Sequence, residues 1–272
     1  MDAILITGGT GFIGSHLARR LVAEGHRVVL FDYYPNLKRI ADIKDKVVVF
    51  KGDIGKLSSL IQALKDFDVE GIFHLAAILT VIAEAEPTAG YEVGIEGTWN
   101  VCEAARIMGV KRLFFASSIA VYGPGVPKIV KGNVYLEPQT LYGISKVFGE
   151  LVGSYFSRKY GINFVACRFP AVVGPGRVDG GTTAYTTLII QKAAQGEPYT
   201  VNVPEDTKLP LIYVKDAVDL MVHAYKQMDR LKCRIYNVGG VQPTPKALSL
   251  IHISEPTRPR LISSAVFCLK KK

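Results

Sequence analysis

Long apolar runs, paired cysteines and low-complexity segments are all missing from this chain of 272 residues. A helix that crosses a bilayer needs about 20 consecutive apolar residues, so the sequence predicts no membrane partner. The four cysteines lie far apart, without the paired spacing of a zinc site, and predict reduced thiols in a cytoplasmic protein that holds no metal. The first predicted strand starts at Ala3, which is expected to leave no room for a signal peptide.

The formal net charge of +9 raises the question of an anionic partner such as nucleic acid. Much of this charge lies in residues 248–272, which hold five basic residues and one acidic residue and so leave +5 on residues 1–247. An excess of that size suits an anionic cofactor. The sequence therefore predicts no nucleic-acid partner.

Residues 248–272 have a second unusual property. Residues 248–258, LSLIHISEPTR, resemble the translation of a transposase-based sequencing adapter. Residues 262–269, ISSAVFCL, resemble the far end of the same adapter, with Ser264 where tyrosine would be expected, and three lysines follow. The sequence thus predicts a non-native tail, and the natural C-terminus, with its share of any substrate pocket, is expected to be missing.

Apolar runs of strand length alternate with longer helical patterns over most of the chain. Strands that are apolar at nearly every position are typical of a parallel sheet covered by helices on both faces. The sequence therefore predicts a doubly wound α/β fold of the Rossmann kind. The predicted strands are residues 3–7, 27–31, 47–51, 71–75, 112–116 and 163–168, and the predicted helices are residues 12–24, 57–65, 88–108, 141–159, 183–195 and 214–227.

Three glycines, Gly8, Gly11 and Gly14, follow the first predicted strand. In a dinucleotide-binding fold, the first glycine permits a tight turn, the second lets the backbone approach a pyrophosphate, and the third lets the helix pack closely on the strand. The N–H groups at the start of the helix then bind the phosphates. The position between a strand and an amphipathic helix makes this spacing a prediction of a dinucleotide cofactor.

An acidic residue, Asp32, ends the second predicted strand about 20 residues after the glycines. A carboxylate at this position accepts hydrogen bonds from the hydroxyls of the adenosine ribose and repels a 2′-phosphate. The sequence thus favours NAD over NADP as the cofactor.

The regular alternation weakens after Gly174. We therefore predict an NAD-binding domain over residues 1–174 and a small, partial substrate-binding lobe over residues 175–247. Residues 214–227 and 233–238 are expected to return to the main sheet. Given the predicted tail, the lobe is expected to be truncated at its C-terminal end.

A tyrosine and a lysine four residues apart, Tyr142 and Lys146, share one face of a predicted helix. A tyrosine, with a pKa of about 10, is a poor base at neutral pH. A lysine ammonium one turn away, together with a positive nicotinamide ring, would lower that pKa. The pair predicts a base that takes the proton of a substrate hydroxyl while hydride leaves the same carbon for the nicotinamide.

Four longer motifs follow the glycines: GDI at residues 52–54, HLAA at residues 74–77, SSIAVYG at residues 117–123 and YGISK at residues 142–146. Together with the glycines they resemble the extended short-chain dehydrogenases/reductases, the NAD-dependent epimerase/dehydratase family, over essentially all of residues 1–247. The resemblance implies NAD as cofactor and a catalytic Ser118, Tyr142 and Lys146, with Ser118 orienting the substrate oxygen. The cofactor-binding residues it implies are Gly8, Gly11, Phe12, Ile13, Gly14, Asp32, Asp53, Ile54, Leu75, Ala76, Ala77, Tyr142 and Lys146.

Two substrate classes compete within this resemblance. Nucleotide-sugar epimerases place an arginine against the substrate diphosphate, and Leu209 stands at that position here, while Ala171 replaces an asparagine. The segments FPAVVGPG and GGTTAYTT resemble L-threonine 3-dehydrogenases of the short-chain type, in which GGTT borders the amino-acid substrate. An L-threonine-like substrate is therefore favoured. The candidate substrate contacts are Thr80, Ser118, Thr182 and Thr183, although Thr182 and Thr183 could equally cap the predicted helix that follows.

Three features keep alternatives open. Ala184 replaces the acidic residue expected in threonine dehydrogenases, Gly94 replaces an asparagine common in the family, and the turn GGTGFIG is closer to that of sugar epimerases. A UDP-hexose 4-epimerase is thus the second prediction, and an NAD-binding sensor without turnover is the third. Family members often dimerise through helices that match residues 88–108 and 141–159, which makes a homodimer one expected assembly.

Overall fold

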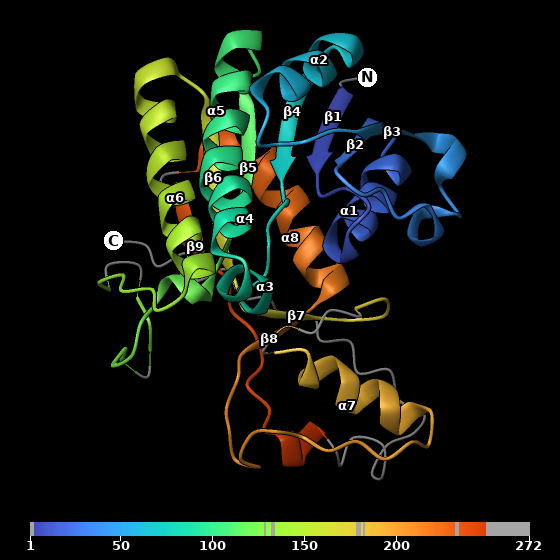
Figure 1. Cartoon of the computed structure of the whole chain (residues 1–272), viewed down its shortest axis with the longest axis vertical. Coiled ribbons are helices and arrows are strands. Elements are labelled where there is room, and N and C mark those ends of the chain that lie inside the picture. The colour runs from blue at the N-terminus through green and yellow to red at the C-terminus, as the bar shows by residue number, and fades with distance from the viewer. Residues whose placement is uncertain are drawn as a thin grey trace.

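A seven-stranded parallel sheet forms the centre of the computed structural model, which describes residues 3–127, 129–131, 134–177, 181, 183–231 and 234–248 (Figure 1). The strand order is β3-β2-β1-β4-β5-β6-β9, and each strand is parallel to its neighbours. The predicted Rossmann-type sheet is therefore confirmed. The strands are β1 Ala3–Thr7, β2 Arg27–Asp32, β3 Val47–Lys51, β4 Val69–His74, β5 Arg112–Ser118, β6 Asn163–Phe169 and β9 Ile235–Asn237.

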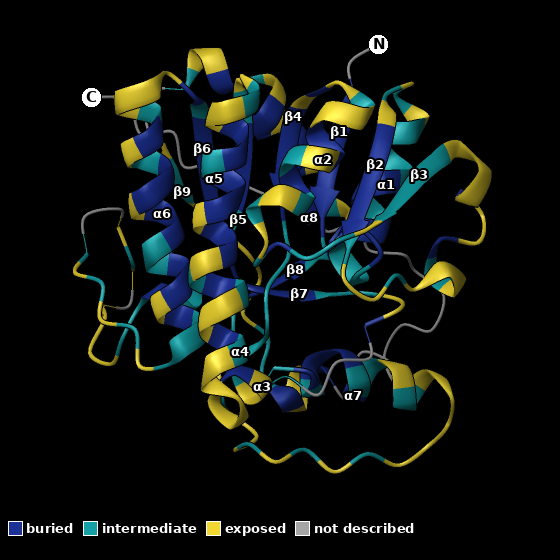
Figure 2. Ribbon diagram, turned by 45° about the horizontal axis from the view of Figure 1, so that its top comes forward, coloured by how far each residue is buried: buried dark blue, intermediate teal, exposed yellow. Residues whose placement is uncertain are grey.

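Helices cover both faces of the sheet, so that its central strands are largely buried, whereas the edge strands β3 and β9 are partly exposed (Figure 2). Alternate residues of β1 enter different cores: Ile4 and Ile6 pack on one side, whereas Leu5 packs on the other. Burial on both sides explains why the strands are apolar at nearly every position. One face carries α1 (Phe12–Ala23) and α8 (Val214–Lys226), and the other carries α2 (Leu57–Phe67), α5 (Gly97–Met108) and α6 (Leu141–Tyr160).

The helix predicted over residues 88–108 is present, but its hydrogen-bond pattern widens over one turn. It consists of α4 (Pro87–Tyr91), a π-helical turn (Glu92–Glu96) and α5, and a further short helix, α3 (Thr80–Ala85), precedes it. Gly94 lies in the π-helical turn, where a Cβ atom would be only 2.7 Å from the Cβ of Ser145 on α6. Gly94 thus allows the close approach of α6, which a larger side chain at this position would prevent.

A smaller group of elements lies at the carboxyl ends of the strands, below the main sheet in Figure 1. It contains α7 (Tyr185–Ala194) and a parallel pair of short strands, β7 (Ala171–Val173) and β8 (Leu211–Tyr213). The pair was not predicted, because three residues carry too little periodicity to identify a strand. The chain then returns to the main sheet through α8, which packs on α1, and through β9, which pairs with β6. The boundary at Gly174 between two domains stays a prediction.

Leu248, the first residue of the predicted non-native tail, packs with Ile189 and Leu211 in a small apolar cluster of this region. The origin of the tail stays a prediction. Cys102 and Cys167 are buried free thiols, whereas the other two cysteines lie outside the described residues. Within the described part of the chain, no helix has both the length and the apolar character needed to span a bilayer.

Candidate functional site

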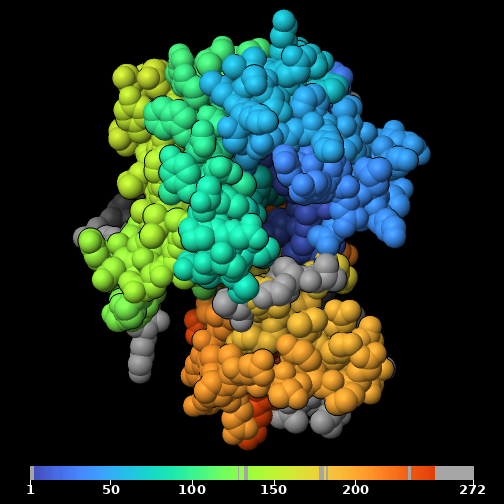
Figure 3. Space-filling view, in the orientation of Figure 1, coloured from blue at the N-terminus to red at the C-terminus, as the bar shows by residue number. Residues whose placement is uncertain are grey.

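A cavity of about 1280 Å³ lies at the carboxyl ends of the main strands, between the sheet and the smaller group of elements. Figure 3 shows the recess, with the dark blue N-terminal residues at its floor. Apart from Thr182, which lies outside the described residues, every predicted site residue lines this cavity. They are Gly8, Gly11, Phe12, Ile13, Gly14, Asp32, Asp53, Ile54, Leu75, Ala76, Ala77, Thr80, Ser118, Tyr142, Lys146 and Thr183.

The glycine turn between β1 and α1 leaves space that any side chain would fill. Gly8 has a φ of +68°, and a Cβ there would lie 3.0 Å from the backbone of Ala76. At Gly14, a Cβ would lie 2.3 Å from the carbonyl oxygen of Gly8. No side chain caps the N-terminus of α1, so its first N–H groups are left for a ligand. The turn therefore fits the pyrophosphate of a dinucleotide.

Asp32, at the end of β2, is held in place by Thr10 of the glycine turn. The backbone N–H of Thr10 donates to Asp32 Oδ2 at 3.1 Å, and the Thr10 hydroxyl donates to the same oxygen at 2.7 Å. The Thr10 hydroxyl in turn accepts a hydrogen bond from the backbone N–H of Asn36. Both bonds use one carboxylate oxygen, so the other is available to the hydroxyls of a ribose in the cavity.

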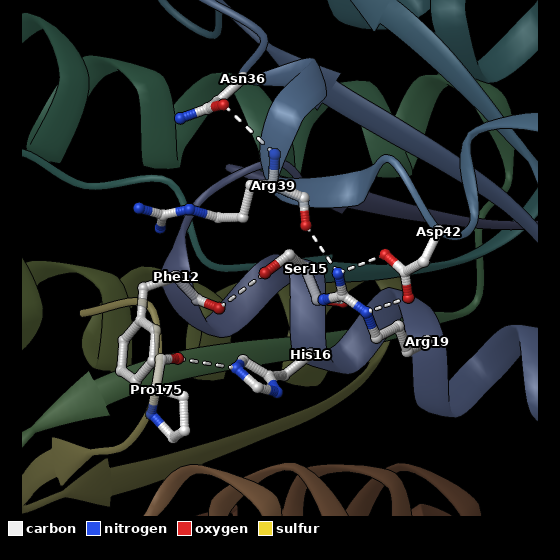
Figure 4. Close-up of polar contacts among 8 residues, drawn as sticks. All are labelled: Phe12, Ser15, His16, Arg19, Asn36, Arg39, Asp42 and Pro175. Atoms are coloured by element: carbon white, nitrogen blue, oxygen red, sulfur yellow. Dashed lines mark hydrogen bonds and ion pairs between the residues drawn. The ribbon is translucent and has the colours of Figure 1, made fainter. Parts of the chain in front are cut away.

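The segment after β2 is fixed against α1 by a second set of polar contacts (Figure 4). Arg19 of α1 donates to both carboxylate oxygens of Asp42, and also to the carbonyl oxygen of Arg39 at 2.6 Å. Asn36 caps the short 3₁₀ helix that carries Arg39, whose side chain lines the cavity. The wall of the cavity next to Asp32 is thus firmly held.

Ser118 and Tyr142 come together although they belong to β5 and α6. Both side chains line the cavity, and Ser118 lies close enough to Tyr142 to favour the ionised phenol. Burial raises the pKa of Tyr142, and the Ser118 hydroxyl and the positive charge of Arg177 only partly oppose this effect. The expected lowering of this pKa by Lys146 is not found: the cation that acts on the phenol is Arg177, and the net effect is a rise.

Lys146 lies on the same face of α6 as Tyr142. Its Nζ is 5.4 Å from the ring centroid of Tyr142 and 4.8 Å from that of Phe115 on β5. Burial lowers the pKa of Lys146 to about 8, and the negative charge of Glu150 opposes this. A lysine of this kind gains or loses its proton close to neutral pH.

Arg177 is a site residue that the sequence did not indicate. Its buried guanidinium lines the cavity, donates to the hydroxyl of Thr183 at 2.9 Å and to the carbonyl oxygen of Val172 at 3.0 Å, and acts electrostatically on Tyr142. An arginine beside Gly-Pro-Gly gives no periodic signal, so only the folded chain shows that it points inward.

The other sequence departures fall in different places. Ala171 lines the cavity, whereas Leu209 packs in the apolar cluster of the smaller region and Ala184 is buried. His74, which was given no catalytic role, is buried between the hydroxyls of Thr7 and Thr98. Among the described residues, no group of histidine, cysteine and acidic side chains is arranged to hold a metal ion.

Residues 4–239 match the sequence profile of the NAD dependent epimerase/dehydratase family. The chain belongs to this family. It is therefore an enzyme of the NAD-dependent dehydrogenase and epimerase type, as the motifs predicted, and NAD is its cofactor. The predicted cytoplasmic location stays a prediction.

Curated relatives of this epimerase/dehydratase include dehydrogenases of two substrates. The mitochondrial L-threonine 3-dehydrogenase of Bos taurus is 30% identical over 260 residues, which cover 93% of this chain and 69% of the relative. The D-erythronate dehydrogenase of Cupriavidus necator is 32% identical over 256 residues, which cover 89% of this chain and 78% of the relative.

Solved structures similar to this chain include L-threonine dehydrogenases and a UDP-glucose 4-epimerase. A GalE-like L-threonine dehydrogenase of Cupriavidus necator has a TM-score of 0.84 at 31% identity, covering 90% of this chain and 80% of the other. A UDP-glucose 4-epimerase of Thermus thermophilus in complex with NAD has a TM-score of 0.79 at 26% identity, covering 91% and 81%. A monomeric L-threonine 3-dehydrogenase from a metagenome has a TM-score of 0.84 at 29% identity, covering 92% and 82%.

Proposed function

We propose that this epimerase/dehydratase is an NAD-dependent dehydrogenase of a small secondary alcohol that carries a carboxylate, with L-threonine as the leading candidate. The observation that carries the proposal is that the hydroxyls of Ser118 and Tyr142 and the cation of Arg177 line one cavity, where both Ser118 and Arg177 act on Tyr142. Ser118 can orient a substrate hydroxyl and Tyr142 can take its proton. The positive charge of Arg177 favours a substrate that carries a negative charge.

Ser118 orients the substrate oxygen, and Tyr142, once deprotonated, takes the proton of that hydroxyl. Bound NAD supplies the acceptor for the hydride that leaves the same carbon, so that the alcohol becomes a carbonyl compound. Lys146 places a positive charge against the face of the Tyr142 ring, which favours the phenolate that the step requires.

The substrate end of the cavity favours a carboxylate. Arg177 brings a buried positive charge, and Thr183 accepts a hydrogen bond from it, so the Thr183 hydroxyl keeps its own proton to donate to a substrate oxygen. L-Threonine and D-erythronate, which the names of the two curated relatives specify, both combine a carboxylate with a secondary hydroxyl. Thr80, at the start of α3, is a further candidate contact.

A nucleotide-sugar 4-epimerase is the second candidate. The sequence of the glycine turn and the likeness to the epimerase of Thermus thermophilus favour it. Leu209 argues against it, because this side chain packs in an apolar cluster and offers no cation to a diphosphate. An NAD-binding sensor is the third candidate, although it would have no need of a Ser118–Tyr142 pair.

The test is to follow NADH absorbance with the purified protein, NAD, and L-threonine, D-erythronate or UDP-glucose in turn. Steady NADH formation with either carboxylate supports the dehydrogenase. Interconversion of UDP-glucose and UDP-galactose without net NADH would establish the epimerase and contradict our proposal. Binding of NADH without turnover of any of the three would leave only the sensor.

We also propose a homodimer. The outer surfaces of α5 and α6 expose several large apolar side chains, and burying them against a second copy would remove them from water. Light scattering tests this: a dimer is expected, and Leu151→Glu should give the monomer. A monomeric wild-type protein, as in the metagenomic relative, would contradict the proposal. The exposed residues are Trp99, Ile107, Ile144, Leu151 and Tyr155.

A further inference from the structure

A buried ion pair lies behind the part of α6 that carries Tyr142 and Lys146. Glu150 of α6 and Arg168 of β6 have side chains that are only 2% and 5% exposed. Arg168 donates from Nε and Nη2 to the two carboxylate oxygens of Glu150, each at 2.7 Å. This is the two-pronged geometry in which an arginine holds a carboxylate most firmly.

The pair connects α6 to three strands of the sheet. Ser117, next to Ser118 on β5, donates its hydroxyl to Glu150 at 2.6 Å. Arg168 also donates to the hydroxyl of Tyr122 at 2.7 Å, and Tyr122 donates to the side chain of Asn237 on β9 at 2.7 Å. The end of β5 and the catalytic face of α6 are therefore held by one set of buried polar contacts.

One member of this pair, Glu150, also acts on the protonation of Lys146. Tyr142, Lys146 and Glu150 follow one another at intervals of four residues, so they lie along one face of α6. Lys146 is buried against aromatic rings, and the negative charge of Glu150 favours its protonated form.

Other charged or titratable groups surround this face. Arg168 contributes a second cation from β6, and Arg177 acts on Tyr142 from the segment after β7. His74 of β4 is buried, and the combined effect of burial and the charge of Lys146 lowers its pKa to about 3, so it is neutral near pH 7. Glu150 therefore supplies the anion that compensates Lys146.

We propose that the Glu150–Arg168 pair is a positioning unit, which holds α6 against the end of β5 and keeps Lys146 charged beside Tyr142. Stability alone does not explain such a pair, because the cost of removing both ions from water offsets most of their attraction. The proposal rests on the proposed function only in taking Tyr142 and Lys146 as the catalytic groups.

The experiment is an NMR titration of the full chain labelled with [¹³C]lysine. The signal of Lys146 is assigned by its loss in Lys146→Met, and its midpoint is expected at about 8. Glu150→Gln removes the compensating anion, so the midpoint should fall by about one pH unit. Arg168→Gln removes a competing cation, so the midpoint should rise. Glu70→Gln, the same chemical change at an exposed position of β4, should leave it unchanged.

The direction of the change separates this role from a structural one. If Glu150→Gln merely loosened the packing, water would reach Lys146 and its midpoint would rise toward the ordinary 10.5. A rise, or no change, in folded Glu150→Gln would overturn the proposal. If Glu150→Gln fails to fold, the Lys146 midpoint of Arg168→Gln tests the proposal. If neither variant folds, Ser117→Ala tests it. That variant removes one hydrogen-bond donor from Glu150, so the Lys146 midpoint should rise. For either of these, an unchanged or lower midpoint overturns the proposal.

The titration needs no substrate, so it is independent of the proposed function. If the Lys146 midpoint moves as expected but no carboxylate substrate is turned over, the dehydrogenase proposal fails and the positioning unit stands. If turnover is found, the pH at which it appears should move with the Lys146 midpoint in each variant.

Discussion

The two ends of the cavity are built from different kinds of neighbours. The cofactor end is local in sequence: Gly8, Thr10, Gly14 and Asp32 belong to one strand–helix–strand unit, and the bond from Thr10 to Asp32 spans 22 residues. Its chemistry depends mainly on backbone N–H groups and one carboxylate. Segments after β3 and β4 complete this end, since Asp53 and Leu75 line the cavity and Gly8 packs against the backbone of Ala76.

The substrate end is assembled from segments that are far apart in the chain. Ser118 comes from β5, Tyr142 and Lys146 come from α6, and Arg177 and Thr183 come from the chain after β7. Here burial and neighbouring charges change the proton affinities of Tyr142 and Lys146. The comparison teaches that cofactor binding and turnover should respond separately to substitution, and four predictions test this.

The largest effect is expected at Tyr142. Tyr142→Phe removes the base, so turnover should fall by about 10²–10⁴-fold. NADH binding, followed by its fluorescence, should be largely retained, because the glycine turn, Asp32 and Lys146 are untouched and only the hydroxyl of Tyr142 is lost. Turnover at the wild-type rate would contradict the mechanism, and loss of NADH binding would contradict the separation of the two ends.

Arg177 should affect the substrate end of the cavity, through the substrate and through Tyr142, and not the cofactor end. Arg177→Gln removes a charged partner for the substrate carboxylate, and KM should rise by about 10–100-fold with NADH affinity unchanged. Arg177→Lys, which keeps the charge, is the control and should lose less. If a substrate without a carboxylate suffers equally, the arginine supports the fold rather than the substrate.

Asp32 should affect only the cofactor. Asp32→Asn removes the charge that repels a 2′-phosphate, so the preference for NADH over NADPH should narrow by about tenfold or more. Equilibrium binding of both nucleotides measures this ratio. KM for the alcohol should not change, and an unaltered nucleotide preference would contradict the role of Asp32.

The smallest effect is on stability. The pKa of Lys146 is about 8 in the fold and 10.5 ordinarily, so between these pH values the unfolded chain holds a proton that the folded chain has lost. The stability of the folded state should therefore rise with pH in this window, by at most about 1.4 kcal/mol per pH unit. Denaturant titrations at several pH values, compared with Lys146→Met, measure this. A difference between the two proteins that does not change with pH would contradict it.

Much of the main sheet could be predicted, because β1 to β6 are long apolar runs with turn residues between them. The details that the sequence did not predict depend on packing between distant segments. The π-helical turn contains Gly94, which packs against Ser145 of α6. The β7–β8 pair forms between two segments that are about 40 residues apart in the chain. Helical periodicity gives no sign of either.

The sequence by itself determined the parallel sheet, the glycine turn, Asp32 and the Ser118, Tyr142 and Lys146 positions, because each follows from a local pattern or from motifs in order along the chain. Only the tertiary structure decided that Arg177 and Thr183 line the same cavity, that burial raises the pKa of Tyr142, and that Arg168 of β6 pairs with Glu150. The physical reason is that burial and charge act through space, over distances that the folded chain sets and the sequence alone does not reveal.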